Sequence, residues 1–266
     1  MKTTVILSVP LHHLTMEEAV SYFIKKAQVS EQNSVATPNA EILLDAQKNQ
    51  KLSTFLQQTT LNFPDSHSLL WAGAYLNNRW SRRRAIFELM FLSVRKSHWK
   101  NSFPEVITGS DSFLKICERA AEEGLKVFCL GGSGKSSYKN KLFVQTKFPS
   151  LSLDSHSGNG SIEGDPENLE RINKCKPDIL FIGYGCPKQE FWIKRNLPLC
   201  PSVKVAMGIG GTFDFYAGTV KRAPKFMRKL GLEWLYRLIR QPKRIGRIWN
   251  AVIKFPLAIL IAGNKK

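Results

Sequence analysis

Short apolar segments alternate with helical segments along most of this chain, and this alternation is the strongest constraint on its fold. We expect β-strands at residues 4–9, 34–37, 60–63, 106–108, 126–130, 178–182 and 203–207. A capping-box pattern at Thr15 and Glu18 predicts a helix start, and further helices are expected near 40–49 and 111–123. Apolar strands joined by helices are typical of a mostly parallel sheet with helices on both faces. The sequence therefore predicts an α/β fold.

The end of the chain has a different composition. The protein carries 39 Lys and Arg against 21 Asp and Glu, and from residue 221 onward thirteen residues are basic while only Glu233 is acidic. Large apolar residues interleave with these charges at helical spacing. Such a helix can lie on an anionic membrane or hold phosphate groups; the alternative is a helix packed on the protein with solvated charges. We therefore expect an α/β catalytic core at 1–200, and a last strand with a basic amphipathic C-terminal appendage at 201–266.

Export and membrane spanning are not expected from the sequence. The five cysteines form no Cys-x-x-Cys pair, and their odd number and irregular spacing favour reduced thiols. The N-terminus lacks the apolar run and cleavage site of a signal peptide. The longest apolar run near the C-terminus, 255–263, is shorter than the roughly 20 residues of a spanning helix. We expect a cytoplasmic protein, peripheral on the inner face of the membrane.

Candidate chemistry lies after the predicted strands, because parallel α/β sheets bind ligands beyond the carboxyl ends of their strands. Asp65 follows a strand and a proline, where a carboxylate can act as a general base; an N-cap of the next helix is the alternative. The other candidates for substrate binding at this edge are Thr37, Asn39, Gly131, Gly132, Gly183, Gly185, Lys188, Gln189 and Glu190.

Two local motifs suggest other chemistry. Residues 129–136 resemble a phosphate-binding loop, but Cys129 stands where the first glycine is required, so a tight turn without a ligand is as good an interpretation. Asp165 and Glu167 have a spacing that a metal site could use, although turn and cap roles are favoured in that Gly/Ser-rich stretch. We predict no metal site. Permanently charged arginines can stabilise a diphosphate instead, and Arg222, Arg237, Arg244 and Arg247 could supply them.

Three strings taken together resemble one known family. They are Thr37-Pro-Asn-Ala-Glu41 with Pro64-Asp65; Gly183-Tyr-Gly-Cys-Pro-Lys-Gln-Glu190; and a run from Gly210-Gly-Thr-Phe-Asp-Phe215 through Arg222-Ala-Pro224 and Gly231-Leu-Glu-Trp-Leu-Tyr-Arg-Leu238 to Gln241-Pro-Lys-Arg244. In this order they resemble the WecG/TagA/CpsF glycosyltransferases of bacterial surface-polymer synthesis. The resemblance spans residues 4 to 250.

The resemblance implies a Rossmann-like core with a basic helical appendage that closes the site at the membrane. It implies inverting transfer of a sugar, N-acetylmannosamine or its uronic acid, from a UDP-sugar to N-acetylglucosamine on undecaprenyl diphosphate. No cofactor or metal is expected, and the expected partners are the two substrates and an anionic membrane surface, not nucleic acid. Self-association of the core is left open.

Single residues also follow the resemblance. Asp65 matches the family's proposed base, Thr37 and Asn39 match pocket residues, Gln189 matches a pocket glutamine, and Arg222, Arg237 and Arg244 match the basic appendage. Two features depart from the family pattern: Ser66, followed by His67, stands where the family has a glycine after the base, and the stretch 79–100 is unusually basic. The alternatives are a nucleotide-dependent enzyme that uses the 131–136 loop and a non-enzymatic basic module that binds membrane or nucleic acid.

Overall fold

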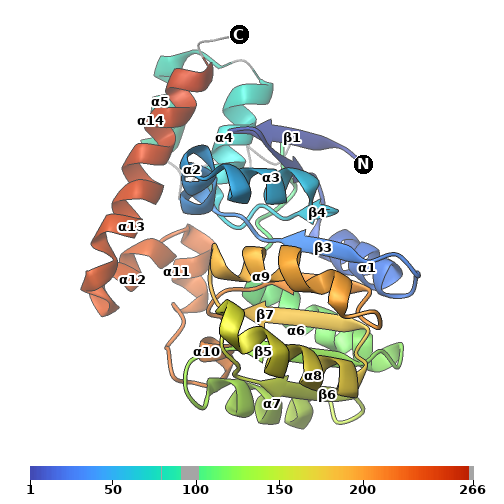
Figure 1. The fold of residues 1–266 in the computed structure, drawn as a ribbon. Helices are drawn as coiled ribbons and strands as arrows, with labels where there is room; N and C mark the ends of the chain where they lie inside the picture. Colours follow the sequence, from blue (N-terminus) through green and yellow to red (C-terminus); the bar gives the residue numbers. More distant parts are fainter. Residues whose placement is uncertain (79, 91–101, 264–266) are drawn as a thin grey trace.

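The computed structural model describes residues 1–78, 80–90 and 102–263, and its centre is a parallel sheet (Figure 1). Six strands pair in the order β4-β3-β8-β7-β5-β6. Their bounds are β3 Asn33–Ala36, β4 Leu61–Asn62, β5 Val127–Gly131, β6 Leu153–His156, β7 Ile179–Gly183 and β8 Val205–Gly208. All five pairings are parallel, which confirms the predicted α/β fold class.

Helices cover both faces of the sheet because successive side chains of a strand point to opposite sides. In β5, Phe128 and Leu130 belong to one buried cluster and Val127 and Cys129 to the other. The first cluster includes residues of α3 (Gln50–Gln58), α8 (Asp165–Cys175) and α9 (Lys188–Asn196). The second includes residues of α1 (Met16–Ala27), α6 (Gly109–Glu122) and α7 (Ser136–Lys147). The predicted capping box at Thr15 and Glu18 is present at the start of α1.

Three expectations about strands were wrong. The first segment is an antiparallel hairpin of β1 (Thr3–Ile6) and β2 (Val9–His12), because the chain reverses at Leu7 and Ser8, which have positive φ. Residues 106–108 form a loop, in which the Ile107 N–H donates to the Pro64 carbonyl over 3.0 Å without extending the sheet. The outer strand β6 was missed because only the first of its four residues, Leu-Asp-Ser-His, is apolar.

Two further helices follow β3 and β4, and a third packs on one of them. Helix α2 (Ala40–Lys48) follows β3, and α4 (His67–Asn77) follows β4. Helix α5 (Arg82–Met90) is the described part of the basic stretch 79–100, of which residues 79 and 91–100 lie outside the described ranges. All five cysteines are free thiols, as expected.

The C-terminal appendage (residues 221–266) is basic, and its described part, 221–263, is largely helical, as predicted. It follows α10 (Thr212–Tyr216) and contains α11 Lys225–Leu230, α12 Glu233–Arg240, η4 Pro242–Arg244, α13 Ile245–Trp249, η5 Asn250–Lys254 and α14 Phe255–Ala262. Figure 1 shows it in red and orange along one side of the molecule. Strand β8, which we grouped with the appendage, lies at the centre of the sheet between β3 and β7. The sheet therefore extends past residue 200, and the division into a core at 1–200 and an appendage at 201–266 stays a prediction about which residues serve which function.

One continuous helix of the appendage has the length and composition of a membrane span. It runs from Pro242 to Ala262, and its most apolar window is largely exposed. The sequence argument missed it because it counted only the uninterrupted apolar run at 255–263, whereas the helix continues through Arg247 and Lys254. Its inner side packs on the protein, where Phe255, Pro256 and Ile259 are buried. A single helix of this kind is weak evidence for spanning.

We predict that Gly131→Ala destabilises the protein strongly. Gly131 has φ +110°, and a Cβ there would lie 2.8 Å from the carbonyl carbon of Gly183 on the paired strand. The expected loss in the free energy of unfolding is at least about 2 kcal/mol, measured by urea denaturation. Gly124→Ala is the control, because Gly124 also has positive φ but has open space around it. Equal losses for the two variants would contradict the close-approach argument.

Candidate functional site

The loops after β3 and β4 lie together at the carboxyl edge of the sheet, where the sequence predicted the site. The Asp65 N–H donates to the Pro38 carbonyl over 3.1 Å, which ties the second loop to the first. The Thr37 hydroxyl donates to the Gly208 carbonyl at the end of β8 over 3.4 Å. Three adjacent strands therefore bring Thr37 and Asp65 to one place.

Asp65 is a partly accessible carboxylate in a poorly solvated position. Burial raises its pKa to about 8, and the negative charge of Glu233 adds to the rise; Arg237, the Gly109 N–H and Arg222 oppose it. The Gly109 N–H lies 3.5 Å from Asp65 Oδ2. Ser66, not Asp65, occupies the N-cap position of α4, so the capping alternative is not what the structure shows. A carboxyl group with a pKa near neutrality is suited to general base catalysis.

Two of the charges that act on Asp65, those of Glu233 and Arg237, come from α12 of the appendage. Arg237 Nε donates to Glu233 Oε1 over 3.0 Å, one turn away on the same helix. The guanidinium of Arg237 also lies over the ring of Phe215, 5.4 Å from its centroid. This cation–π contact connects α12 to the segment that follows β8. The predicted residue Arg237 is thus at the site, already partly neutralised by Glu233.

Asn39 has a structural role at the start of α2. Its Oδ1 accepts a hydrogen bond from the Ile42 N–H over 3.0 Å, which is an N-cap interaction. The side-chain amide Nδ2 makes no hydrogen bond within the described residues and is available as a donor. Asn39 can therefore fix the loop after β3 and still contact a ligand.

Arg222 is held by a carboxylate that the sequence argument missed. Its two terminal nitrogens donate to Asp111, over 2.6 Å to Oδ1 and 2.8 Å to Oδ2. Arg228 approaches the same Oδ1 at 3.4 Å, and the Thr108 hydroxyl donates to Oδ2 over 2.8 Å. These cations hold the pKa of Asp111 below its usual value despite burial. Arg222 therefore attaches the appendage to the start of α6 by an ion pair. Its predicted contact with a phosphate group stays a prediction.

The other two predicted arginines lie further along the appendage and differ in their partners. Arg247 donates to Glu41 of α2 over 2.7 Å. Arg244 has no ion-pair partner within the described residues, and burial together with the charges of Arg237 and Arg247 lowers its pKa. A half-buried cation with cationic neighbours is suited to receive an anion.

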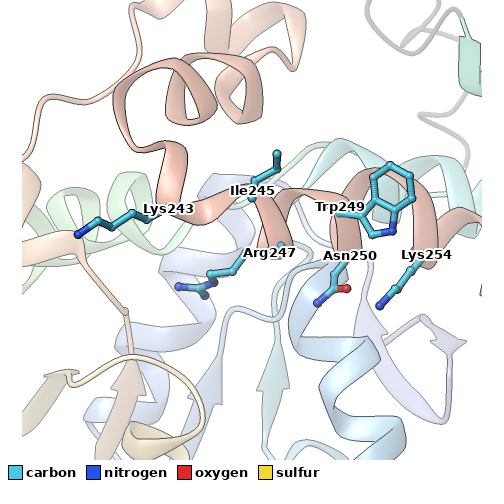
Figure 2. Close-up of a pocket in the computed structure, with 7 residues that line it drawn as sticks. Lys243, Ile245, Arg247, Trp249, Asn250 and Lys254 are labelled. Atoms are coloured by element: carbon cyan, nitrogen blue, oxygen red, sulfur yellow. The ribbon is translucent and has the colours of Figure 1, made fainter.

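An open hollow of about 620 Å³ runs along the same helix (Figure 2). It is lined by Lys243, Ile245, Gly246, Arg247, Trp249, Asn250 and Lys254. In Figure 2 the polar ends of Arg247, Asn250 and Lys254 point to one side of the helix, whereas Ile245 points to the other side. The appendage thus presents a basic side and an apolar side.

The loop after β7 is held by Gln189 from inside the protein. Its Oε1 accepts from the Gly185 N–H over 3.2 Å and from the Gly210 N–H over 3.0 Å. Its Nε2 donates to Glu190, which is itself buried and whose pKa is raised by burial. Gln189 and Glu190 therefore position the ends of β7 and β8, while Lys188 is exposed beside them. Whether Gln189, Glu190, Gly183, Gly185 and Lys188 also bind substrate stays a prediction.

The glycine loop after β5 does not have the arrangement of a phosphate-binding loop. Asp214 Oδ1 accepts from the Ser133 hydroxyl over 2.6 Å and from the Ser133 N–H over 3.3 Å. A carboxylate therefore occupies a position at which a phosphate would be received, and Lys135 is exposed. Gly131 and Gly132 have positive φ, and the Gly132 N–H donates to the Gly183 carbonyl over 3.2 Å. The interpretation as a tight turn is favoured.

The Asp-x-Glu motif is used for structure. Asp165 begins α8 and pairs with Arg195 at 2.5 Å, and Glu167 pairs with Arg171 at 3.1 Å. Among the described residues, no group of three His, Cys, Asp or Glu side chains gathers as a metal site would require.

The sequence assigned no role to Asp111, Glu233 or Asp214. Asp111 had no local signal, and Glu233 lay inside a quoted family string without a role, because their partners Arg222 and Asp65 are more than 100 residues away along the chain. Asp214 lay inside a quoted family string, but the 81-residue separation from Ser133 hid its role.

Comparison with known proteins supports a single family. The model of the family described as "Glycosyl transferase WecG/TagA/CpsF family" matches residues 4–98 and 92–266. A curated relative from Staphylococcus aureus (strain MRSA252) is named N-acetylglucosaminyldiphosphoundecaprenol N-acetyl-beta-D-mannosaminyltransferase. It is 33% identical over 214 residues, which cover 80% of this chain and 74% of the relative.

We predict that Asp111→Asn loosens the appendage and reduces catalytic efficiency by about 10- to 100-fold, because misplacing groups around a reacting centre has effects of this size. Limited trypsin digestion should release the appendage faster than in the unmodified protein. The control is Glu122→Gln, which removes a surface carboxylate paired with Arg119 at the other end of α6. Unchanged digestion and turnover in Asp111→Asn would show that the ion pair does not hold the appendage.

Proposed function

The chain belongs to the WecG/TagA/CpsF family of glycosyltransferases, and on this premise we propose that it transfers N-acetylmannosamine, or the corresponding uronic acid, from a UDP-sugar to N-acetylglucosamine on a polyprenyl diphosphate. The name of the Staphylococcus aureus relative supports the acceptor and the mannosaminyl group. The observation that carries the proposal is Asp65, a carboxyl group of raised pKa at the strand ends beneath a basic appendage.

In the proposed reaction, a hydroxyl oxygen of the acceptor sugar attacks the anomeric carbon from the face opposite UDP. The new glycosidic bond forms as the bond between that carbon and the UDP oxygen breaks, so the configuration inverts. The hydroxyl proton passes to the Asp65 carboxylate, and the electron pair of the broken bond leaves on UDP. A base with a pKa near the working pH is most effective in such a step.

Two diphosphates need positive charge in this reaction, one on the departing UDP and one on the lipid. Arg237 lies next to the base, and Arg244 has no ion-pair partner within the described ranges. Guanidinium groups bind phosphate oxygens in a bidentate manner and stay charged. We assign these two arginines to phosphate binding, and Arg222 and Arg247 to holding the appendage as well.

Membrane association follows from a lipid-linked acceptor, and the appendage carries a surface that suits it. Five apolar side chains, each four residues from the next, are exposed along the helix that ends at Ala262: Ile245, Trp249, Ile253, Leu257 and Ile261. Basic residues lie beside this stripe, as in helices that rest in the membrane interface. The helix also packs on the core through Phe255 and Ile259. We propose that the protein sits peripherally on the inner face of the membrane.

The same geometry bears on the alternative functions. A nucleotide-dependent enzyme built on the 131–136 loop is disfavoured because the Asp214 carboxylate already accepts the hydrogen bonds that Ser133 of this loop would donate to a phosphate. A non-enzymatic basic module is also disfavoured, because binding to a membrane or to nucleic acid would not require a carboxyl group of raised pKa surrounded by arginines. Nucleic acid is not proposed as a partner, and self-association stays a prediction.

We predict that Asp65→Asn abolishes acceptor-dependent release of UDP while UDP binding persists. The assay combines the protein, a short-chain prenyl-diphospho-N-acetylglucosamine and a panel of UDP-sugars. The expected loss in kcat is at least about 100-fold, since the base is lost but its shape is kept. In the unmodified protein, kcat/KM should rise as the pH increases through about 8 and then level off, because Asp65 must be ionised to accept the proton.

Glu233→Gln tests the electrostatic part of this prediction. Removing a like charge lowers the pKa of Asp65, so the rise of kcat/KM should move to lower pH. Substantial turnover by Asp65→Asn, or a pH profile that falls through this range, would reject the assignment of the base. No release with any donor would reject the proposed acceptor or reaction.

We predict that EDTA does not inhibit the transfer and that added Mg²⁺ does not stimulate it. The physical reason is that the arginines of the appendage carry the positive charge that a metal would otherwise supply. The measurement is UDP release with and without EDTA at fixed substrate concentrations. Inhibition that Mg²⁺ reverses would show that the reaction requires a metal.

A further inference from the structure

Helix α5 exposes large apolar side chains and buries its acidic one, while Ala85 and Leu89 pack on the core. Ile86 and Met90 are 46% and 77% exposed, whereas Glu88 is 3% exposed and Ala85 is fully buried. Ile86 and Met90 are four residues apart, so they lie on one face of the helix. A surface helix of a globular protein normally has the opposite arrangement. The exposed apolar side chains of α5 therefore indicate a surface that binds a partner or a membrane.

The start of α5 is strongly basic. Arg82, Arg83 and Arg84 are all exposed, and none has an ion-pair partner within the described ranges. The guanidinium of Arg84 lies over the ring of Trp80, 4.8 Å from its centroid. Exposed arginines next to exposed aliphatic side chains are typical of helices that lie in the interface of an anionic membrane.

The position of α5 supports a lipid surface rather than a protein partner. Helices α5 and α14 both pack against α4, and Ala85, Phe255 and Ile259 belong to the same buried cluster. Figure 1 shows α5 and α14 at the same end of the molecule. The exposed side chains of α5 and the exposed Leu257 and Ile261 of α14 thus belong to two helices that pack on the same helix, α4.

A second copy of this chain is a poorer fit to the same face. A two-fold contact would bring the three arginines of each copy together, and their repulsion would oppose association. One helix with two aliphatic side chains also offers far less than the roughly 800 Å² per partner of a stable interface. An anionic bilayer satisfies both the arginines and the aliphatic side chains.

We propose that α5 is a second membrane-binding helix, outside the appendage, which inserts Ile86 and Met90 into the headgroup boundary of an anionic bilayer while Arg82, Arg83 and Arg84 contact lipid phosphates. This inference rests on the proposed membrane association of the enzyme. It implies two points of contact with the membrane, one at α5 and one at the C-terminal helix. Two contacts fix the orientation of the protein on the bilayer, which one helix alone does not.

The test is flotation of the full chain with vesicles of phosphatidylcholine, with and without phosphatidylglycerol. The variant Ile86→Ser/Met90→Ser should bind anionic vesicles at least about 10-fold more weakly than the unmodified protein. The matched control is Tyr138→Ser/Leu142→Ser, which removes two exposed apolar side chains with the same spacing on α7. The control should bind like the unmodified protein, and Arg82→Gln/Arg83→Gln/Arg84→Gln should lose the preference for anionic vesicles.

Two further measurements keep the outcomes distinct. Turnover with the short-chain acceptor should stay unchanged in the α5 variants, so absence of turnover in every protein would reject the proposed reaction without affecting this inference. Met90→Trp should bind vesicles more tightly, because tryptophan favours the interface, and it decides the matter if the serine variant does not fold. Equal vesicle binding by the α5 variants and the control would overturn the proposal. Loss of self-association instead of vesicle binding would assign the face to a second copy.

Discussion

The ion pair between Arg222 and Asp111 fixes where the appendage begins its course over the strand ends. It is bidentate, and Arg228 approaches the same carboxylate. The first turn of α6, which carries Asp111, also supplies the Gly109 N–H that faces Asp65. The ion pair and the base therefore contact the same helical turn, and a change at Asp111 is only two residues from the contact with Asp65. A second ion pair, between Arg247 and Glu41, holds the appendage to α2.

Charge balance explains why so basic a segment can close over a carboxylate. Asp111, Glu41 and Glu233 neutralise three arginines of the appendage, and Glu233 also opposes the ionisation of Asp65. Burial then outweighs the nearby arginines, so the pKa of Asp65 rises rather than falls. Arg244 is left with cationic neighbours and no ion-pair partner in the described part of the chain. The site thus combines a carboxyl group that can accept a proton with a cation that can accept a diphosphate.

The apolar surfaces lie where a lipid-linked substrate would approach. The exposed stripe of the C-terminal helix and the exposed face of α5 both belong to helices that pack on α4, and α4 begins two residues after Asp65. A single helix, α4, therefore connects the loop that carries Asp65 to the two helices that bear the exposed apolar side chains. This arrangement would let the lipid tail stay in the bilayer while its sugar reaches the strand ends.

The sequence by itself determined the parallel α/β class and the position of Thr37 and Asp65, because residues that follow parallel strands meet at one edge whatever the strand order. It also determined the basic helical character of the appendage, which is a property of local spacing. Only the tertiary structure decided that β8 is central, that Asp111 and Glu233 belong to the site, that Gln189 acts from inside, and that the apolar face of α5 points outward. These features depend on contacts between residues far apart in the chain, and no local pattern encodes such partners.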